Sequence, residues 1–175
     1  MNLELMDVYY DSKNKKIYRN FESMGKKLLL VKMEVYPRDG YPFHWLLENG
    51  KKPPFDIAIN KEDASISYIK FFFQDEKIKK IDKVIKVKSE KNGFPKFNIG
   101  NFNQTKYQIF NEGDVNAFFD GLNLCLIISS IEIHKFLNLD ENNVLLFSND
   151  GFFAGVLFKN LLKDEIEELK FAQIL

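Results

Sequence analysis

The sequence predicts an α+β domain built mainly on antiparallel β-strands, as a curved sheet or a sandwich with one or two short helices. Turn signals recur at short intervals, and β-branched and aromatic residues fill the runs between them. Only the stretch near 164–172 has a clear helical pattern. At 175 residues and 45% apolar content, the chain suits one ordinary domain covering residues 1–175.

The first third of the chain predicts two hairpin strands and a longer strand. Residues 8–10 and 17–21 flank the turn-forming sequence Asp-Ser-Lys-Asn at 11–14, which favours a hairpin. Residues 28–36 are rich in β-formers and end at Pro37. Three groups of turn residues then make 37–54 the longest predicted irregular connection, with at most one helical turn at 44–47.

The middle of the chain predicts strands at 55–59 and 66–73, joined through 60–64. Residues 78–88 fit both helical and alternating spacing, and we favour a strand. Residues 97–99 and 106–110 continue the strand pattern. Asp114 is expected to begin a short helix that runs through Phe119 and ends at Gly121.

The last third holds nearly continuous apolar runs at 124–133 and 144–147, which indicates strands covered on both faces. Residues 152–158 should pair with 144–147 through a tight turn at Asp150 and Gly151. Gly155 inside that strand predicts a bulge or a close backbone approach. The helix is expected to start at Asp164, because an acidic first turn suits the helix dipole.

Charge is balanced overall but unevenly distributed along the chain. Residues 1–111 hold 21 Lys and Arg against 14 Asp and Glu, a net charge of +7, and residues 112–175 hold 4 against 11, a net charge of −7. Opposed basic and acidic surfaces would follow if the two halves stay apart in the fold. Mixing of the charges would follow if the halves interleave.

The sequence predicts a cytoplasmic location. The only cysteine, Cys125, sits in an apolar run and is expected to be a buried, reduced thiol. The N-terminus has no signal-peptide pattern. The most apolar stretch, 122–133, is shorter than the roughly 20 residues of a membrane span, so no membrane partner is expected.

Enzymatic signatures are missing from the sequence, which favours a non-enzymatic protein. There is no glycine-rich phosphate loop, no nucleophile elbow and no metalloprotease motif. Two histidines and one cysteine make a zinc site of the usual kind improbable. We therefore expect no metal and no cofactor.

The weak catalytic candidates are Glu132 and His134. If 124–134 is a strand, these two side chains and Ser130 share one face, where a carboxylate could orient the imidazole as a general base. The simpler interpretation is a strand end that turns polar towards solvent.

The strongest binding candidate is the segment 36–45, which contains the only tryptophan. Trp, Tyr and Arg anchor interfaces because each buries a large area and keeps a polar tip. The alternative is a loop folded back over the core with Phe43 and Trp45 as its plug. The predicted binding residues are Tyr36, Arg38, Tyr41, Phe43, His44 and Trp45.

A lysine-rich stretch at 76–96 is a weaker candidate for nucleic-acid binding. It carries eight lysines and three acidic residues, a net charge of +5, but no arginine. Solvated lysines that protect a sheet edge would give the same pattern. The candidate residues are Lys79, Lys80, Lys86 and Lys88.

These observations favour a non-enzymatic, cytoplasmic module that binds another protein. An immunity or inhibitor-type protein is its most concrete form, because the sequence combines one compact domain, no catalytic motif and polarised charge beside an aromatic loop. The abundance of Lys, Asn, Ile and Phe, which A/T-rich codons encode, indicates a microbe or phage with an A/T-rich genome. The alternative is a small-molecule-binding barrel or a carboxylate/His enzyme whose pocket is lined by Tyr36, Tyr41, Phe43 and Trp45 with residues 71–73. Nucleic-acid binding ranks third.

Overall fold

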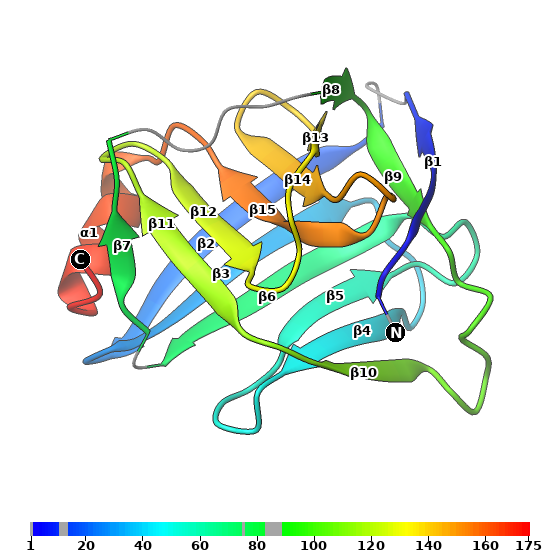
Figure 1. Cartoon of the computed structure of the whole chain (residues 1–175), viewed down its shortest axis with the longest axis horizontal. Coiled ribbons are helices and arrows are strands. Elements are labelled where there is room, and N and C mark those ends of the chain that lie inside the picture. Colours follow the sequence, from blue (N-terminus) through cyan, green and yellow to red (C-terminus); the bar gives the residue numbers. More distant parts are fainter. Residues whose placement is uncertain (1, 11–13, 75, 83–88) are drawn as a thin grey trace.

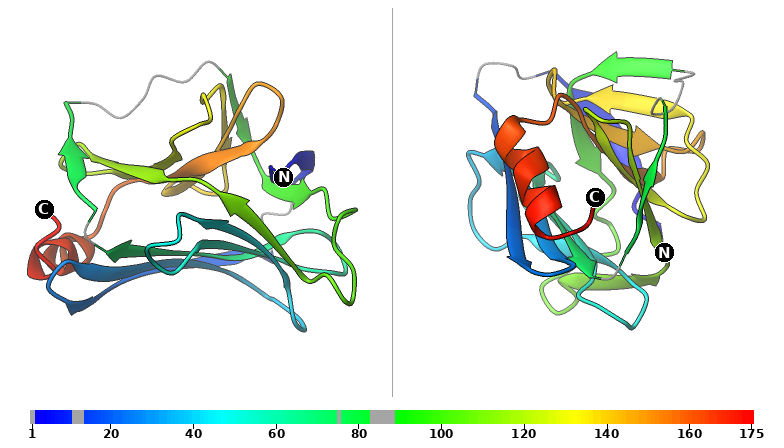
Figure 2. Two further views of the ribbon diagram at one scale, coloured as in Figure 1. Left: turned by 60° about the horizontal axis from the view of Figure 1, so that its bottom comes forward. Right: turned by 90° about the vertical axis from the view of Figure 1, so that its left-hand side faces the viewer.

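The fold is a sandwich of two facing sheets with a helix at one end (Figures 1 and 2). The computed structural model describes residues 2–10, 14–74, 76–82 and 89–175. Most strand pairs in this part of the chain are antiparallel. The α+β class predicted from the sequence is confirmed.

The first sheet has six strands in the order β10-β4-β5-β6-β3-β2. Its neighbours are antiparallel except for β10, which runs parallel to β4. Alternate residues of each strand point into the sandwich, as the buried and half-buried pattern of β3 shows. The strands are β2 (Lys16–Gly25), β3 (Leu28–Tyr36), β4 (Phe43–Glu48), β5 (Phe55–Ile59), β6 (Ile66–Gln74) and β10 (Gln108–Glu112).

The second sheet has seven strands in the order β7-β11-β12-β15-β14-β13-β8. Its two edge strands run parallel to their neighbours, and the five central strands are antiparallel. The strands are β7 (Ile78–Lys80), β8 (Ser89–Asn92), β11 (Val115–Phe119), β12 (Leu124–Ile128), β13 (Lys135–Asn138), β14 (Asn143–Phe147) and β15 (Phe153–Phe158).

A two-stranded sheet and a helix complete the fold. β1 (Leu5–Tyr9) pairs with β9 (Phe94–Phe97) beside the two large sheets (Figure 1). α1 (Lys163–Phe171) lies against β2 at the opposite end of the sandwich (Figure 2). No helix within the described residues is long and apolar enough to cross a membrane.

Arg19 ties α1 to the first sheet. Its guanidinium forms two 2.7 Å bonds with the Glu165 carboxylate, and both side chains are 8% exposed. It also donates to the backbone oxygens of Asn142 and Lys159. The same carboxylate accepts the backbone N–H of Leu162 at the helix start. One buried ion pair therefore joins β2, the second sheet's loops and the helix.

Two apolar clusters fill the molecule. The larger lies between the sheets and is rich in phenylalanine, with Phe55, Phe147 and Phe153 in edge-to-face or tilted contact. The smaller contains Cys125 and Leu146 and lies on the outer side of the seven-stranded sheet. Every residue of β14 and β15 is buried, so the predicted burial of this region on both faces is confirmed.

The predicted hairpin between residues 8–10 and 17–21 is wrong. β1 pairs with β9, and β2 pairs with β3 across the turn at Gly25. Tertiary pairing with a distant strand has overridden the local turn signal. Of the proposed turn, residues 11–13 lie outside the described residues.

Two predicted helical turns are strands. Residues 44–47 belong to β4, because Phe43, Trp45 and Leu47 recur every second residue and all three are buried. The expected helix from Asp114 to Phe119 is β11, which pairs with β12 along its whole length.

Other boundaries shift by a few residues. The strand expected at 97–99 lies at β9, and that expected at 106–110 is β10. The strand favoured at 78–88 is present as β7, and residues 83–88 lie outside the described part of the chain. The hairpin of β14 and β15 and the C-terminal helix are confirmed.

The uneven charge follows the layers. All six strands of the first sheet come from residues 16–112, and the five central strands of the second sheet come from residues 115–158. The basic part of the sequence therefore supplies one layer, and the acidic part supplies the centre of the other and the helix.

Candidate functional site: a tyrosine-bearing sheet face

The predicted binding segment 36–45 is divided between the two sides of the first sheet. Trp45 is 2% exposed and packs edge-to-face on Phe153 in the core. Phe43 is also buried and stacks on Phe102 at 4.8 Å. Phe43 and Trp45 are therefore part of the core, as in the alternative interpretation of this segment. Trp45 also lines a small surface cavity of about 240 Å³. Because β4 is a strand, its neighbouring residue His44 points to the outer side.

Five of the seven tyrosines lie on the outer side of the six-stranded sheet, which we call the tyrosine face. Tyr18 and Tyr36 come from neighbouring strands and contact each other edge-to-face at 5.5 Å. Tyr41 is 86% exposed, on the loop before β4. Defined by its side chains, the face contains Tyr18, Lys32, Glu34, Tyr36, Arg38, Tyr41, His44, Asp56, Tyr68, Lys70 and Tyr107.

Tyr68 is at the centre of this face, and cations surround its ring. The Lys70 Nζ lies 4.4 Å from the ring centroid, the Lys32 Nζ 5.9 Å and the Arg38 guanidinium carbon 6.0 Å. The ring's negative face attracts such cations. Burial raises the pKa of the Tyr68 hydroxyl, and the Asp56 charge raises it further, so the hydroxyl stays protonated at neutral pH.

Glu34 is the carboxylate closest to these cations. It pairs with Lys32, lies 3.7 Å from Arg38 Nη1, and accepts a 2.6 Å hydrogen bond from the Tyr36 hydroxyl. Burial works to raise the pKa of Glu34, but the bonds from Lys32 and Tyr36 outweigh it and hold the pKa below its ordinary value. The carboxylate therefore stays ionised and positions Arg38 over the Tyr36 ring, 4.7 Å from its centroid.

His44 and Asp56 form the polar pair at the other end of the face. His44 Nδ1 lies 2.9 Å from Asp56 Oδ1, and the Tyr68 hydroxyl donates to Oδ2 at 3.2 Å. A carboxylate that holds one ring nitrogen leaves Nε2 as the nitrogen that can contact a ligand. Tyr41, Lys61, Gln104 and Tyr107 are beside it, and this lining includes no hydroxyl or thiol nucleophile of Ser, Thr or Cys.

Two shallow grooves follow the face on either side of Pro42. One, of about 350 Å³, is lined by Lys32, Arg38, Gly40, Pro42, Ser67, Tyr68 and Lys70. The other, of about 320 Å³, is lined by Tyr41, Pro42, His44, Lys61, Gln104 and Tyr107. Both are open, so they suit a protruding segment of a partner better than an enclosed small molecule.

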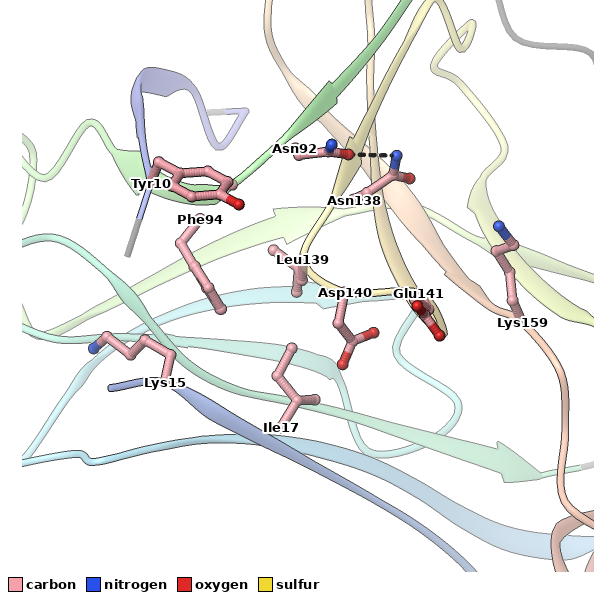
Figure 3. A pocket seen from close by; sticks show the side chains of 11 residues that line it. Tyr10, Lys15, Ile17, Asn92, Phe94, Asn138, Leu139, Asp140, Glu141 and Lys159 are labelled. Carbon is pink, nitrogen blue, oxygen red and sulfur yellow. Dashed lines mark hydrogen bonds between the residues drawn. The ribbon is translucent and has the colours of Figure 1, made fainter. Parts of the chain in front are cut away.

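A half-open cleft of about 600 Å³ lies next to the β13–β14 turn (Figure 3). Asn138 donates to Asn92 in its wall at 3.0 Å, and the buried Asn138 Oδ1 accepts no bond from a described residue. The Asp140 carboxylate accepts bonds from Asn142 and Asn143 and so holds the turn. The lining is Tyr10, Lys15, Ile17, Asn92, Gly93, Phe94, Asn138, Leu139, Asp140, Glu141 and Lys159.

The aromatic residues that were predicted to line one pocket do not lie together around a cavity. Phe43, Trp45, Phe71 and Phe73 are packed in the core, whereas Tyr36 and Tyr41 lie outside it. Within the described residues the two sheets form no closed barrel, since each ends in edge strands.

Glu132 and His134 do not share a strand face. β12 ends at Ile128, and residues 129–134 form a turn and an irregular segment. The two side chains still meet, with His134 Nε2 3.3 Å from Glu132 Oε1, but Glu132 is largely exposed. No cavity described above is lined by either residue.

The lysine candidates are separate from the tyrosine face. Lys79 and Lys80 are exposed on edge strand β7, and Lys79 lies over the Phe118 ring at 5.5 Å. Lys86 and Lys88 lie outside the described residues. Among the residues described, no group of three or more His, Cys, Asp or Glu side chains could hold a metal ion.

Sequence reasoning missed seven of the eleven side chains that define the tyrosine face. Tyr68, Lys70, Lys32 and Asp56 lie on predicted strands, and the alternation of polar with apolar residues at 28–36 and 66–73 was the available signal. Their meeting depends on the pairing of β3 with β6 and of β6 with β5, which the sequence does not specify.

No protein-family model matches the chain, and no curated protein matches its sequence significantly.

Proposed function

We propose that this chain is a non-enzymatic module that binds another protein through the tyrosine face. The observation that supports this most directly is the gathering of five tyrosines with Arg38 and His44 on one open sheet face. Tyrosine and arginine contribute large contact areas and polar tips at interface hot spots. The sheet beneath is closely packed, so the face is pre-organised for binding.

An inhibitor or immunity-type protein acting in the cytoplasm is the specific form of this proposal. A pre-organised face with many aromatic rings suits tight association with one partner. The single buried thiol suits a reducing compartment.

The proposal is tested by retention of a partner from the cell that produces this protein. The immobilised protein is compared with a variant carrying Tyr18→Ser, Tyr41→Ser and Tyr107→Ser, three exposed tyrosines of the face. A hot-spot tyrosine contributes about 2 kcal/mol, so the variant should weaken binding by roughly 30-fold or more. The control carries Met6→Ser and Tyr10→Ser, which are exposed elsewhere.

The expected result is a partner retained by the wild type and the control and lost by the tyrosine variant. Equal retention by all three proteins would place the interface elsewhere and contradict the proposal. Circular dichroism checks that the variants remain folded.

Small-molecule binding in the half-open cleft is a second candidate function, favoured by the cleft's volume of about 600 Å³ and by the buried acceptor Asn138 Oδ1. A ligand there would raise the unfolding temperature of the wild type. It would not raise that of a Leu139→Trp variant, in which an indole fills the cleft.

A further inference from the structure

The groove centred on Tyr68 has an excess of positive charge. Its lining contributes three cations, Lys32, Arg38 and Lys70, and no carboxylate. Two acidic groups lie beside the groove: Glu34 pairs with Lys32 and lies near Arg38, and Asp56 accepts a hydrogen bond from the Tyr68 hydroxyl. Lys70 forms no ion pair with any described residue, and its ammonium group lies 4.4 Å from the Tyr68 ring centroid.

The pairing of β3 with β6 brings two of these cations together. Lys32 and Lys70 are directly opposite each other in the antiparallel register, on the same side of the sheet. Like charges opposite each other destabilise a sheet, and an anion between them would relieve the repulsion. On its other side Lys70 is directly opposite Asp56 of β5, and Lys32 pairs with Glu34, so the repulsion is partly offset in the free protein. An acidic ligand would add to this compensation.

The second groove, beyond Pro42, continues this surface. Lys61 adds a cation there, 5.8 Å from the Phe43 ring centroid, and the exposed rings of Tyr41 and Tyr107 add apolar area. A ligand that fills both grooves would place acidic groups near Lys70 and a hydrophobic or aromatic group near Tyr41.

We infer that the tyrosine face recognises an acidic segment of the partner protein, with Arg38 and Lys70 contacting its carboxylates. This inference rests on the proposed function. Arginine suits the role because its planar fork can bind a carboxylate through two hydrogen bonds. Lys32 is held by Glu34 and contributes charge instead of a free donor.

A nucleic acid fits this face less well than a protein. Bases would have to stack on the rings, but cations already lie over Tyr36 and Tyr68. Two carboxyl groups, Glu34 and Asp56, lie where a phosphate backbone would pass. An acidic peptide with spaced carboxylates avoids both conflicts.

The inference is tested with a fluorescein-labelled peptide of alternating Glu and Leu residues, and binding is measured by fluorescence anisotropy at low and physiological salt. A Ser/Leu peptide of equal length and a labelled oligo-dT are the comparison probes. The test variant is Arg38→Ala with Lys70→Ala. The control variant is Lys26→Ala with Lys163→Ala, which removes two exposed cations away from the face.

The wild type and the control should bind the acidic peptide, more weakly at higher salt. The test variant should lose at least about tenfold in affinity, because a charge-assisted contact is worth more than one tenfold step. A structural role for Lys70 is excluded if Lys70→Ala leaves the unfolding midpoint unchanged or raised, as expected where the repulsion from Lys32 at least balances the attraction of Asp56. A lowered midpoint would contradict the inference.

Equal binding of the acidic and Ser/Leu peptides would overturn the inference, as would equal losses in the test and control variants. Tighter binding of oligo-dT, abolished by the same test variant, would assign the face to nucleic acid instead. The partner-retention experiment separates the two proposals. A partner lost by the tyrosine variant but kept by the Arg38→Ala, Lys70→Ala variant supports the interface and rejects the acidic segment.

Discussion

At the residue scale, Cys125 shows how burial changes the acidity of a side chain. The thiol is fully buried in the apolar cluster on the outer side of the seven-stranded sheet. Burial raises the pKa of Cys125, and the Asp120 charge raises it further. This result agrees with the sequence-based expectation of a buried thiol, which required only the apolar residues on either side.

The raised pKa predicts a loss of stability at alkaline pH. The unfolded thiol ionises near pH 8.5, whereas the folded protein keeps its proton, so above that pH the folded state binds more protons and is destabilised as pH rises. Between pH 8 and pH 10 the wild type should lose about 2 kcal/mol of unfolding free energy relative to Cys125→Ala. Urea unfolding of both proteins measures this change, and parallel pH profiles would contradict it.

Gly155 is a second residue whose role was predictable. A Cβ atom at this position would lie 2.0 Å from the Leu126 backbone oxygen, so the strand can pack only without a side chain. The sequence indicated a close approach because a glycine interrupts an apolar strand. It did not indicate that β12 would be the neighbour, since that depends on tertiary pairing.

At the element scale, the contact between β2 and α1 depends on the ion pair of Arg19 with Glu165. Glu165 is nearly buried, and its carboxylate is the only acidic group within salt-bridge distance of Arg19 among the described residues. Removal of one partner leaves a buried charge without compensation. The helix would then lose both its start and its attachment, because Glu165 also accepts the Leu162 N–H.

Glu165→Ala should therefore lower the unfolding free energy by about 3–5 kcal/mol. Lys163→Ala removes an exposed pair with Glu167 on the same helix and should change it by less than about 1 kcal/mol. Replacing both partners, with Arg19→Met and Glu165→Leu, should recover most of the loss. Guanidinium unfolding followed by circular dichroism measures all three, and equal effects of the two single substitutions would contradict this account.

Elements with one dominant periodic signal were predictable from the sequence. The β14–β15 hairpin has a tight-turn sequence between two apolar runs, and α1 has an acidic first turn. β4 was missed because proline and glycine on both sides suggested a loop, although Phe43, Trp45 and Leu47 alternate. Glu132 and His134 were placed on a strand because β12 was extended five residues too far, from Ile128 to residue 133.

At the scale of the whole molecule, the two parts of the sequence depend on each other. The edge strands β7 and β8 come from the first part and pair with β11 and β13 from the second. One apolar cluster fills the space between the sheets and draws residues from both parts. Such shared pairing could not be read from the sequence, because register between distant strands leaves no local signal.

That residues 1–175 form a single domain is therefore a prediction, and two separately produced fragments of the chain can test it. Residues 1–113 and 114–175, produced separately, should each lack dispersed amide resonances, because each would expose half of the shared core. Mixed together, they should recover the spectrum of the intact chain. Cooperative unfolding of either fragment alone would show that the sandwich contains two independent units.

The contact between Arg19 and Glu165 can form only late in the synthesis of the chain. The two residues are 146 positions apart. At translation rates of roughly 5–20 residues per second, this separation corresponds to roughly 7–30 s. During that interval Arg19 has been made but Glu165 has not. The phenylalanine-rich inner side of the first sheet is also exposed, because the central strands of the second sheet have not all been made. Newly made copies on the ribosome should therefore depend on chaperones far more than the finished protein does.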